Sequence, residues 1–278
     1  MKNALSLGTF DGVHIGHKAV LNLPQDHKKT AITFYKPPKS VISGNEELLM
    51  LPEEKVKAIK SLGIDEVKVF HFEEIRDLSA EDFLALIKDE FNPDFISFGF
   101  NHRFGKNGTG DAQMLKSFCE SKGIKFQMCG AVMFEGEPVS STLIRSLLKE
   151  GKVEVASKLL CSPFSFENEV ISGHQRGRRL SFPTINQKYP EGLVRLKFGV
   201  YKSLVIVDGK EYEGITNIGI RPTFQSDYVI SETHIKDFNK DIYGKTVRIV
   251  PLEFLREEIK FSSEEELKAQ ILKDINSI

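Results

Sequence analysis

The chain has 278 residues, 40% of them hydrophobic, with a formal net charge of −1 and an isoelectric point near 6.7. That length exceeds the size of one typical core, so two compact domains are expected. A charge this close to neutral gives a nucleic-acid partner no electrostatic support and favours small anionic ligands.

No apolar run reaches membrane-spanning length, and the first residues lack the apolar core of a signal peptide. A cytoplasmic protein without a membrane partner is therefore expected. The cysteines Cys119, Cys129 and Cys161 are odd in number and lack CxxC spacing. This pattern argues against a disulfide framework or a zinc site and predicts reduced, structural thiols. The composition indicates no particular oligomeric state.

Residues 1–160 alternate apolar runs with amphipathic stretches, which is typical of a parallel sheet covered by helices. Strands are expected at Ala4–Leu7, Ala31–Phe34, Glu66–Phe72, Asp94–Phe98 and Lys125–Val132. Helices are expected at Pro52–Leu62, Ala80–Phe91 and Asp111–Lys122. Ser79 with Asp82 resembles a capping box ahead of the second helix. In such a sheet, ligands bind at the carboxyl ends of the strands.

The glycine-rich segment after the first strand, Gly8–His17, has the sequence GTFDGVHIGH. A tight turn into a new helix presents free backbone N–H groups and the positive end of a helix dipole, which suit a polyphosphate. His14 and His17 share one helical face, and Gly16 between them has no Cβ to obstruct a ligand. A bare HxxH is more often an ordinary pair of histidines, but the surrounding GxFDG favours a phosphate site.

A second polar segment, Gly99–Asp111, has the sequence GFNHRFGKNGTGD and also follows a predicted strand. Asn101 lies just past the strand end, and Asp111 is expected to cap the next helix. His102 and Arg103 are equally consistent with solvated loop residues. Because both polar segments follow strands, they can converge on one crevice.

A third segment, Val139–Arg145, has the sequence VSSTLIR. Ser141 and Thr142 lie where a helix begins, so their hydroxyls and the adjacent free N–H groups can hold phosphates. Arg145 shares their helical face and adds a permanent charge. The simpler alternative is a capping serine followed by a solvated arginine.

Residues 161–278 change to alternating β runs. Gly199–Val207 and Lys210–Ile218 predict a β-hairpin with a type I′ turn at Asp208-Gly209. Further strands are expected at Ser231–Phe238 and Thr246–Phe254. This half is therefore expected to be predominantly β.

The chain ends in a segment with helical periodicity, Ser263–Ile275. Its first serine suits an N-cap position. The apolar residues of one helical stripe are expected to pack on the β half as core: Leu267, Ile271, Leu272 and Ile275.

Three segments of the second half carry polar residues with a chemical use: Gly173–Asn186 (GHQRGRRLSFPTIN), Asn217–Phe224 (NIGIRPTF) and Ser231–Gly244 (SETHIKDFNKDIYG). Gly173 and Gly177 flank a loop whose backbone could wrap nucleotide phosphates. Thr184 and Asn186 share one face of an extended segment, and Glu232 lies in an alternating β run. Neither a Walker A sequence nor a dinucleotide-binding GxGxxG is present.

The segments of the first half resemble three motifs of the flavin-adenylating nucleotidyltransferases: HxGH, G-x-[DN]-x-[RT]-F-G followed by a Gly-Asp pair, and SSTxIR. Those of the second half resemble the riboflavin kinase motif G-x-x-x-G-R-x-L-G-F-P-T-x-N and two further blocks of that kinase. The chain is thus similar to the bacterial bifunctional riboflavin kinase/FAD synthetases. The resemblance implies a Rossmann-like α/β FMN adenylyltransferase domain over residues 1–160. It also implies a β-barrel riboflavin kinase domain with a closing helix over residues 161–278.

Two ATP-dependent reactions are implied: riboflavin is phosphorylated to FMN with release of ADP, and FMN is adenylylated to FAD with release of pyrophosphate. The resemblance gives the adenylyl transfer to His14, His17 and Arg145, and the role of kinase base to Glu232. Residues implied in nucleotide and flavin binding are Gly8, Phe10, Asp11, Gly16, Asn101, Ser141, Thr142, Gly173, Gly177 and Asn217. Mg²⁺ is the implied cofactor, and Thr184 and Asn186 are its implied ligands.

Two other functions are consistent with parts of the sequence. The first half could use another phosphorylated acceptor, as cytidylyltransferases do, but the kinase-like half argues against this because it supplies FMN. The chain could also be a flavin-binding sensor in which one or both active sites have decayed, or a paralogue with a single activity and one decayed site. Lys36 and Pro37 stand where the family has Pro-His, and Ser181 replaces a glycine. Neither departure removes a residue with a named catalytic role.

Overall fold

A computed structural model describes residues 2–44, 47–172, 182–221 and 228–277 of the chain. The chain divides into two compact units, one formed by Met1–Ile144 with Leu159–Ser162 and the other by Arg145–Lys158 with Pro163–Ile278. In the described ranges, no helix is both long and apolar enough to cross a membrane.

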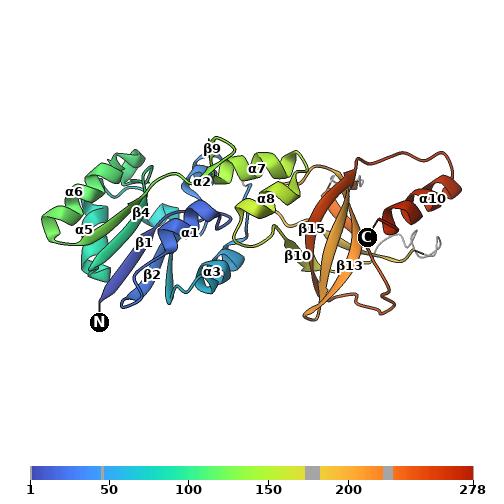
Figure 1. Cartoon of the computed structure of the whole chain (residues 1–278), viewed down its shortest axis with the longest axis horizontal. Coiled ribbons are helices and arrows are strands. Elements are labelled where there is room, and N and C mark those ends of the chain that lie inside the picture. The colour runs from blue at the N-terminus through green and yellow to red at the C-terminus, as the bar shows by residue number, and fades with distance from the viewer. Residues whose placement is uncertain (1, 45–46, 173–181, 222–227, 278) are drawn as a thin grey trace. The chain divides into compact units, whose positions relative to one another are not determined.

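The first unit contains a five-stranded parallel sheet with the strand order β3-β2-β1-β4-β7 (Figure 1). Its strands are β1 (Asn3–Leu7), β2 (Lys28–Phe34), β3 (Glu66–Phe70), β4 (Phe95–Gly99) and β7 (Lys125–Cys129). All five expected strands are therefore present. The third ends two residues earlier than expected, because His71 forms a capping box with Glu74 and Phe72 already begins the helix α4 (Phe72–Ile75).

The longer helices of this unit are α1 (Ile15–Leu21), α2 (Pro38–Ser43), α3 (Pro52–Ser61), α5 (Ala80–Phe91) and α6 (Ala112–Lys122). Short elements complete it: β5 (Arg103–Phe104), η1 (Lys106–Gly108), β6 (Gly110–Asp111), β8 (Met133–Phe134) and β9 (Glu137–Pro138). Helices α7 (Ser141–Lys149) and α8 (Val153–Leu159) cross the division between the units. The predicted caps are confirmed: Ser79 Oγ accepts from the Asp82 N–H at 3.0 Å, and Asp111 Oδ1 accepts from the Met114 N–H at 2.9 Å.

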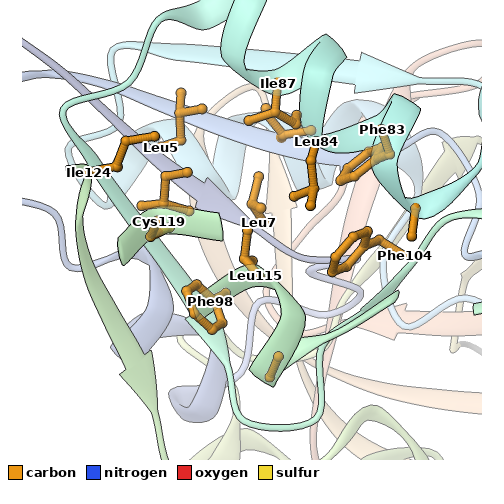
Figure 2. Close-up of a cluster of buried hydrophobic side chains, with 14 of the residues drawn as sticks. Leu5, Leu7, Phe83, Leu84, Ile87, Phe98, Phe104, Leu115, Cys119 and Ile124 are labelled. Atoms are coloured by element: carbon orange, nitrogen blue, oxygen red, sulfur yellow. The ribbon is translucent and has the colours of Figure 1, made fainter. Parts of the chain in front are cut away.

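The parallel sheet buries both of its faces. Leu5 and Leu7 of β1 point to the face covered by α5 and α6, where Ile87 and Leu115 join the same cluster (Figure 2). Ala4 lies in a second cluster with Ile59, which comes from α3 on the other face. Alternate residues of one strand thus feed two cores, as expected for a parallel sheet with helices on both sides.

The cysteines are free thiols, as predicted. Cys119 and Cys129 are buried and Cys161 is exposed. Burial raises the pKa of the Cys119 thiol to about 11, so this thiol stays protonated and acts as a small apolar side chain.

The second unit contains a six-stranded antiparallel sheet with the order β10-β15-β12-β13-β14-β11. Its strands are β10 (Phe166–Glu169), β11 (Thr184–Lys188), β12 (Gly199–Val207), β13 (Lys210–Arg221), β14 (Tyr228–Ile235) and β15 (Thr246–Arg256). The β12–β13 turn has positive φ at Asp208 (50°) and Gly209 (76°), which confirms the type I′ hairpin. A bridge between Ile171 and Asn186 joins the two edges and nearly closes the sheet into a barrel.

Helix α10 (Glu264–Ile275) begins behind Ser263, whose side chain accepts from the Glu266 N–H, as predicted. The expected apolar core stripe is wrong. Its four residues are only half-buried or, as for Leu272 at 47%, exposed, whereas Asp274 is 6% exposed. Asp274 lies three residues after Ile271, on the same side of the helix, and forms an ion pair with Arg256 of β15 at 2.6 Å.

Candidate active sites

The first two predicted polar segments meet at the carboxyl ends of two central strands of the parallel sheet. Strands β1 and β4 are neighbours in parallel register, with Leu7 opposite Phe98. The turn that begins at Gly8 and the loop that carries Asn101 therefore start side by side, as predicted. In the sheet, β2 and β3 lie on one side of β1, and β4 and β7 lie on the other. The strand order therefore reverses between β1 and β4, and open α/β sheets bind ligands at such a switch point.

The turn after β1 is strained and firmly held. Phe10 and Val13 are non-glycine residues with φ of 49° and 43°, a conformation that the surrounding structure must enforce. Thr33 Oγ1 donates to the Thr9 carbonyl at 2.8 Å. The buried Asp11 carboxylate accepts from the Leu49 N–H at 3.0 Å.

Two residues predicted to bind ligand pack inside this turn instead of facing solvent. Phe10 is 0% exposed and Asp11 2% exposed. A Cβ at Gly8 would lie 2.7 Å from the Phe10 ring, so the glycine lets the turn fold over that ring. Gly8, Phe10 and Asp11 thus shape the backbone of the candidate site.

His14 and His17 form a stacked pair at the start of α1. His14 is the N-cap residue, and its Nδ1 accepts from the His17 backbone N–H at 3.2 Å. The ring centroids lie 3.5 Å apart, and the Phe10 ring meets His17 edge-on at 5.4 Å. A Cβ at Gly16 would come within 3.1 Å of the His14 ring, so this glycine makes room for the stack. The shared face expected from the spacing is confirmed.

Burial keeps both imidazoles uncharged near neutral pH. It lowers the pKa of His14 to about 4. Burial, followed by the charges of His14 and Lys55, lowers the pKa of His17 well below its ordinary value. Because Nδ1 of His14 accepts a hydrogen bond, the neutral ring carries its proton on Nε2 and can donate there. Nδ1 of His17 is buried and has no hydrogen-bond partner in the part of the chain that is described.

Lys55 is a buried cation of this site that the sequence analysis did not identify. It lies on α3, is 2% exposed, and donates through Nζ to the backbone carbonyls of Phe34 and Thr9. Burial lowers its pKa to about 8, and the charge of Asp11 opposes that shift. The sequence pattern could have indicated this burial, because Lys55 lies one turn before Ile59 on the apolar stripe of its helix, where a lysine is unusual.

Helix α7 begins at Ser141, as expected, but the hydroxyl of this serine is bound to the protein's own backbone. The capping residue is Ser140, whose Oγ accepts from the N–H three residues on at 3.2 Å. Ser141 Oγ donates to the Asp11 carbonyl at 3.0 Å and ties the helix start to the strained turn. Thr142 is exposed, and Arg145 follows on the same helix.

The loop after β4 places its polar residues in different environments. Asn101 is exposed and folds back over the strand end, with Oδ1 3.2 Å from where a Cβ on Gly99 would lie. His102 is not a solvated loop residue: its ring stacks near Phe104, and burial lowers its pKa to about 4. A separate hollow of about 520 Å³ between α5 and α6 is lined by none of the predicted site residues.

In the second unit, three predicted residues lie side by side across neighbouring strands. Glu232 of β14 is opposite Asn186 of β11 on one side and Asn217 of β13 on the other. Residues in direct register point to the same face of a sheet, with Cβ atoms about 5 Å apart. Oδ1 of Asn217 is buried and has no hydrogen-bond partner among the described residues. A carboxylate flanked by two amides thus forms a polar row, referred to below as the Glu232 row.

Thr184 extends this row by one pair, since it lies two residues before Asn186 on the same face of β11, opposite His234. A cavity of about 60 Å³ beside Thr184 is also lined by Lys240, Asp241 and Tyr243. Gly173 and Gly177, expected to wrap phosphates, lie outside the described residues.

A parallel α/β sheet with a histidine-bearing turn, together with a near-closed barrel that carries the Glu232 row, is the architecture expected of a two-domain nucleotide-dependent transferase. An FAD synthetase model matches residues 1–143 and a riboflavin kinase model matches residues 160–278. The chain belongs to the family of bifunctional riboflavin kinase/FMN adenylyltransferases.

Relatives of that name resemble the chain over nearly its whole length. The one from Listeria monocytogenes is 32% identical and covers 99% of this chain and 90% of its own. The one from Buchnera aphidicola subsp. Schizaphis graminum is 34% identical, and the match covers 99% of this chain and 93% of the relative. A crystal structure named as a macrolide-efflux protein from Streptococcus pneumoniae has a TM-score of 0.91 and 28% identity over 99% of this chain and 93% of that chain. That name differs from those of the two curated relatives.

The neutral state of the histidine pair can be measured directly. We expect the imidazole signals of His14 to keep their neutral-form positions as the pH falls from about 8 to about 5.5, and to move only near a pKa of about 4. An NMR titration, with signals assigned by comparison with His14→Gln, measures this. A midpoint near the ordinary value of 6.5 would mean that the ring is solvated instead of buried.

Proposed function

We propose that the α/β unit adenylylates FMN and that the barrel unit phosphorylates riboflavin. The chain is a transferase with both activities, riboflavin kinase and FMN adenylyltransferase, and ATP is a substrate of each. The proposed domains are residues 1–160 and 161–278. The two family models support this division, although residues 145–158 pack with the second compact unit.

In adenylyl transfer, a phosphate oxygen of FMN forms a bond to the α-phosphorus of ATP while the bond to the bridging oxygen of pyrophosphate breaks. Charge spreads over the reacting oxygens, so positioned donors supply most of the catalysis. We assign His14 and His17 as neutral donors to these oxygens. Arg145, with the help of Ser141 and Thr142 at the start of α7, is assigned to the departing pyrophosphate.

Lys55 contributes to the same site from behind the turn. Its ammonium donates to the Thr9 carbonyl and so braces the strained backbone that leads to the histidines. Its charge also opposes protonation of His17. We propose that adenylyl transfer needs the protonated lysine.

In phosphorylation, the 5′-hydroxyl of riboflavin loses a proton as its oxygen attacks the γ-phosphorus of ATP, and ADP leaves. We assign Glu232 as the general base, because it is the carboxylate of the row that it forms with Asn186 and Asn217. That register is the observation that best supports the assignment, since it places a proton acceptor between two amides.

The family implies Mg²⁺ with ATP, and the donors present fit it. Thr184 and Asn186 offer a hydroxyl and an amide oxygen on one face of β11, next to the Glu232 carboxylate. Magnesium prefers such oxygen ligands and usually takes few from the protein. We propose that these two residues hold the ion, which would neutralise phosphate charge when bound. A chromatographic time course with riboflavin, ATP and magnesium tests the whole proposal, since FMN should appear first and FAD should follow.

Glu232→Gln tests the base. The amide keeps the shape but cannot take the proton, so FMN formation should fall by about two to four orders of magnitude. Conversion of supplied FMN to FAD serves as the internal control and should persist. Kinase turnover near that of the unmodified chain would eliminate Glu232 as the base.

His17→Asn tests the histidine pair. Removing a positioned donor should slow FAD synthesis from FMN by about 10²-fold or more, while riboflavin phosphorylation is spared. The free energy of unfolding provides the check: early unfolding with loss of both activities would support a structural role and contradict the catalytic one.

The lysine predicts the pH dependence of FAD synthesis. Because burial lowers the pKa of Lys55 to about 8, its charge is present below that pH and is lost as the pH rises through it. FMN-to-FAD turnover should therefore be flat from about pH 6 to 7 and fall above about 8. In Lys55→Arg, which stays charged, the alkaline fall should disappear. An unchanged alkaline limb in that variant would assign the fall to another group.

A further inference from the structure

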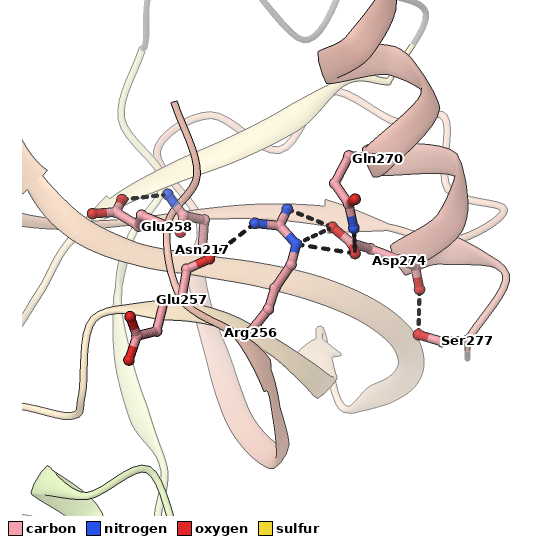
Figure 3. Close-up of polar contacts among 7 residues, drawn as sticks. All are labelled: Asn217, Arg256, Glu257, Glu258, Gln270, Asp274 and Ser277. Carbon is pink, nitrogen blue, oxygen red and sulfur yellow. Dashed lines mark hydrogen bonds and ion pairs between the residues drawn. The ribbon is translucent and has the colours of Figure 1, made fainter. Parts of the chain in front are cut away.

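The residue that follows β15 by two positions, Glu258, contacts the Glu232 row. Its Oε1 accepts from Nδ2 of Asn217 at 3.1 Å, and Figure 3 shows the carboxylate directed at that amide. Asn217 is itself opposite Glu232 in the strand register. One end of the Asn217 amide is thus bound to Glu258, while its other end, Oδ1, is buried and unpartnered within the described residues.

The backbone of β13 is shaped to receive Glu258. Gly219 lies two residues after Asn217, on the same face of the strand. A Cβ at Gly219 would come within 2.3 Å of Oε1 of Glu258. Any side chain at this position would displace the carboxylate from the strand, so the glycine provides its seat.

The segment that carries Glu258 is anchored from the other side. Arg256 binds Asp274 of α10 through Nε at 3.1 Å and Nη2 at 2.6 Å, and its Nη1 donates to the Glu257 carbonyl at 3.1 Å. Gln270 donates to the same aspartate at 2.8 Å. The Asp274 side chain is 7% exposed, which makes this a largely buried pair with its hydrogen bonds satisfied. The backbone next to Glu258 is therefore fixed to the C-terminal helix.

The neighbouring carboxylate shows that the contact is specific. Glu257 is turned away from the row in Figure 3. Its side chain is 73% exposed and pairs with Lys197 at 2.9 Å. Both glutamates are exposed, but their partners differ, and of the two only Glu258 contacts Asn217.

We propose that Glu258 is a positioning residue of the riboflavin kinase site, which fixes the Asn217 amide so that Oδ1 is held as an acceptor beside the base Glu232. A carboxylate can only accept from an amide, so it binds the NH₂ end and sets the orientation of the group. The held Oδ1 then accepts from a hydroxyl or N–H donor of the bound substrates during phosphorylation. This inference rests on the proposed function of the Glu232 row.

Glu258→Ala, Glu258→Gln and the matched control Glu257→Ala test it in the full chain. Losing one positioning hydrogen bond should lower kcat for FMN formation about tenfold in Glu258→Ala, with little change in KM for riboflavin. Glu258→Gln, whose side-chain oxygen still accepts, should recover to within about twofold, and Glu257→Ala should be unchanged. FMN-to-FAD turnover, as internal control, should be unaffected in all three.

A double-mutant cycle with Asn217→Ala decides whether Glu258 acts through the amide. In the Asn217→Ala background, Glu258→Ala should cost nothing further. The inference would be overturned if kcat of the double variant fell by the product of the two single effects. Normal kinase turnover in Glu258→Ala, or failure of Glu258→Gln to recover, would overturn it too. So would early unfolding in Glu258→Ala with loss of both activities, which would show a purely structural role. Absence of kinase turnover in the unmodified chain would instead overturn the proposed function.

Discussion

Strand register is the constraint on which both sites depend. In the α/β unit, parallel pairing of β1 with β4 sets the histidine turn next to the Asn101 loop. In the barrel unit, antiparallel pairing of β11, β14 and β13 lines up Glu232 between two amides. A slip of one residue in β14 would turn Glu232 to the opposite face of the sheet and separate it from both partners. The hydrophobic pattern that sets the strand register therefore also determines which polar residues of the candidate sites lie together.

The two sites treat buried charge in different ways. In the first unit the histidines are neutral, and Lys55 is satisfied by backbone carbonyls near the Asp11 charge. In the second unit Arg256 and Asp274 neutralise each other in a largely buried pair between β15 and α10. Each arrangement avoids an isolated buried ion, which would be strongly unfavourable.

Local signals in the sequence predicted most of the fold. The type I′ hairpin and the caps Ser79, Asp111 and Ser263 depend on a few adjacent residues and were found where expected. Within the candidate sites, the shared face of the two histidines follows from their spacing, whereas the stacking of their rings is visible only in the structure. The misses are long-range. On the half-buried side of α10 the most buried residue is Asp274, which pairs with a distant strand, and the contact of Lys55 is with a turn far from it in the sequence. Glu258 could not be told from Glu257 by sequence, because tertiary contacts alone separate the two.

The uncharged state of the histidine pair also bears on turnover. In the proposed reaction the pyrophosphate leaves with high negative charge, and charged histidines would add to the attraction of Arg145 for it and slow its dissociation. Neutral rings act through directed hydrogen bonds, whose strength depends on the geometry of the reacting oxygens and falls once that geometry relaxes. In the proposed reaction, the uncharged state of His14 and His17 thus leaves Arg145 as the full positive charge assigned to the leaving group.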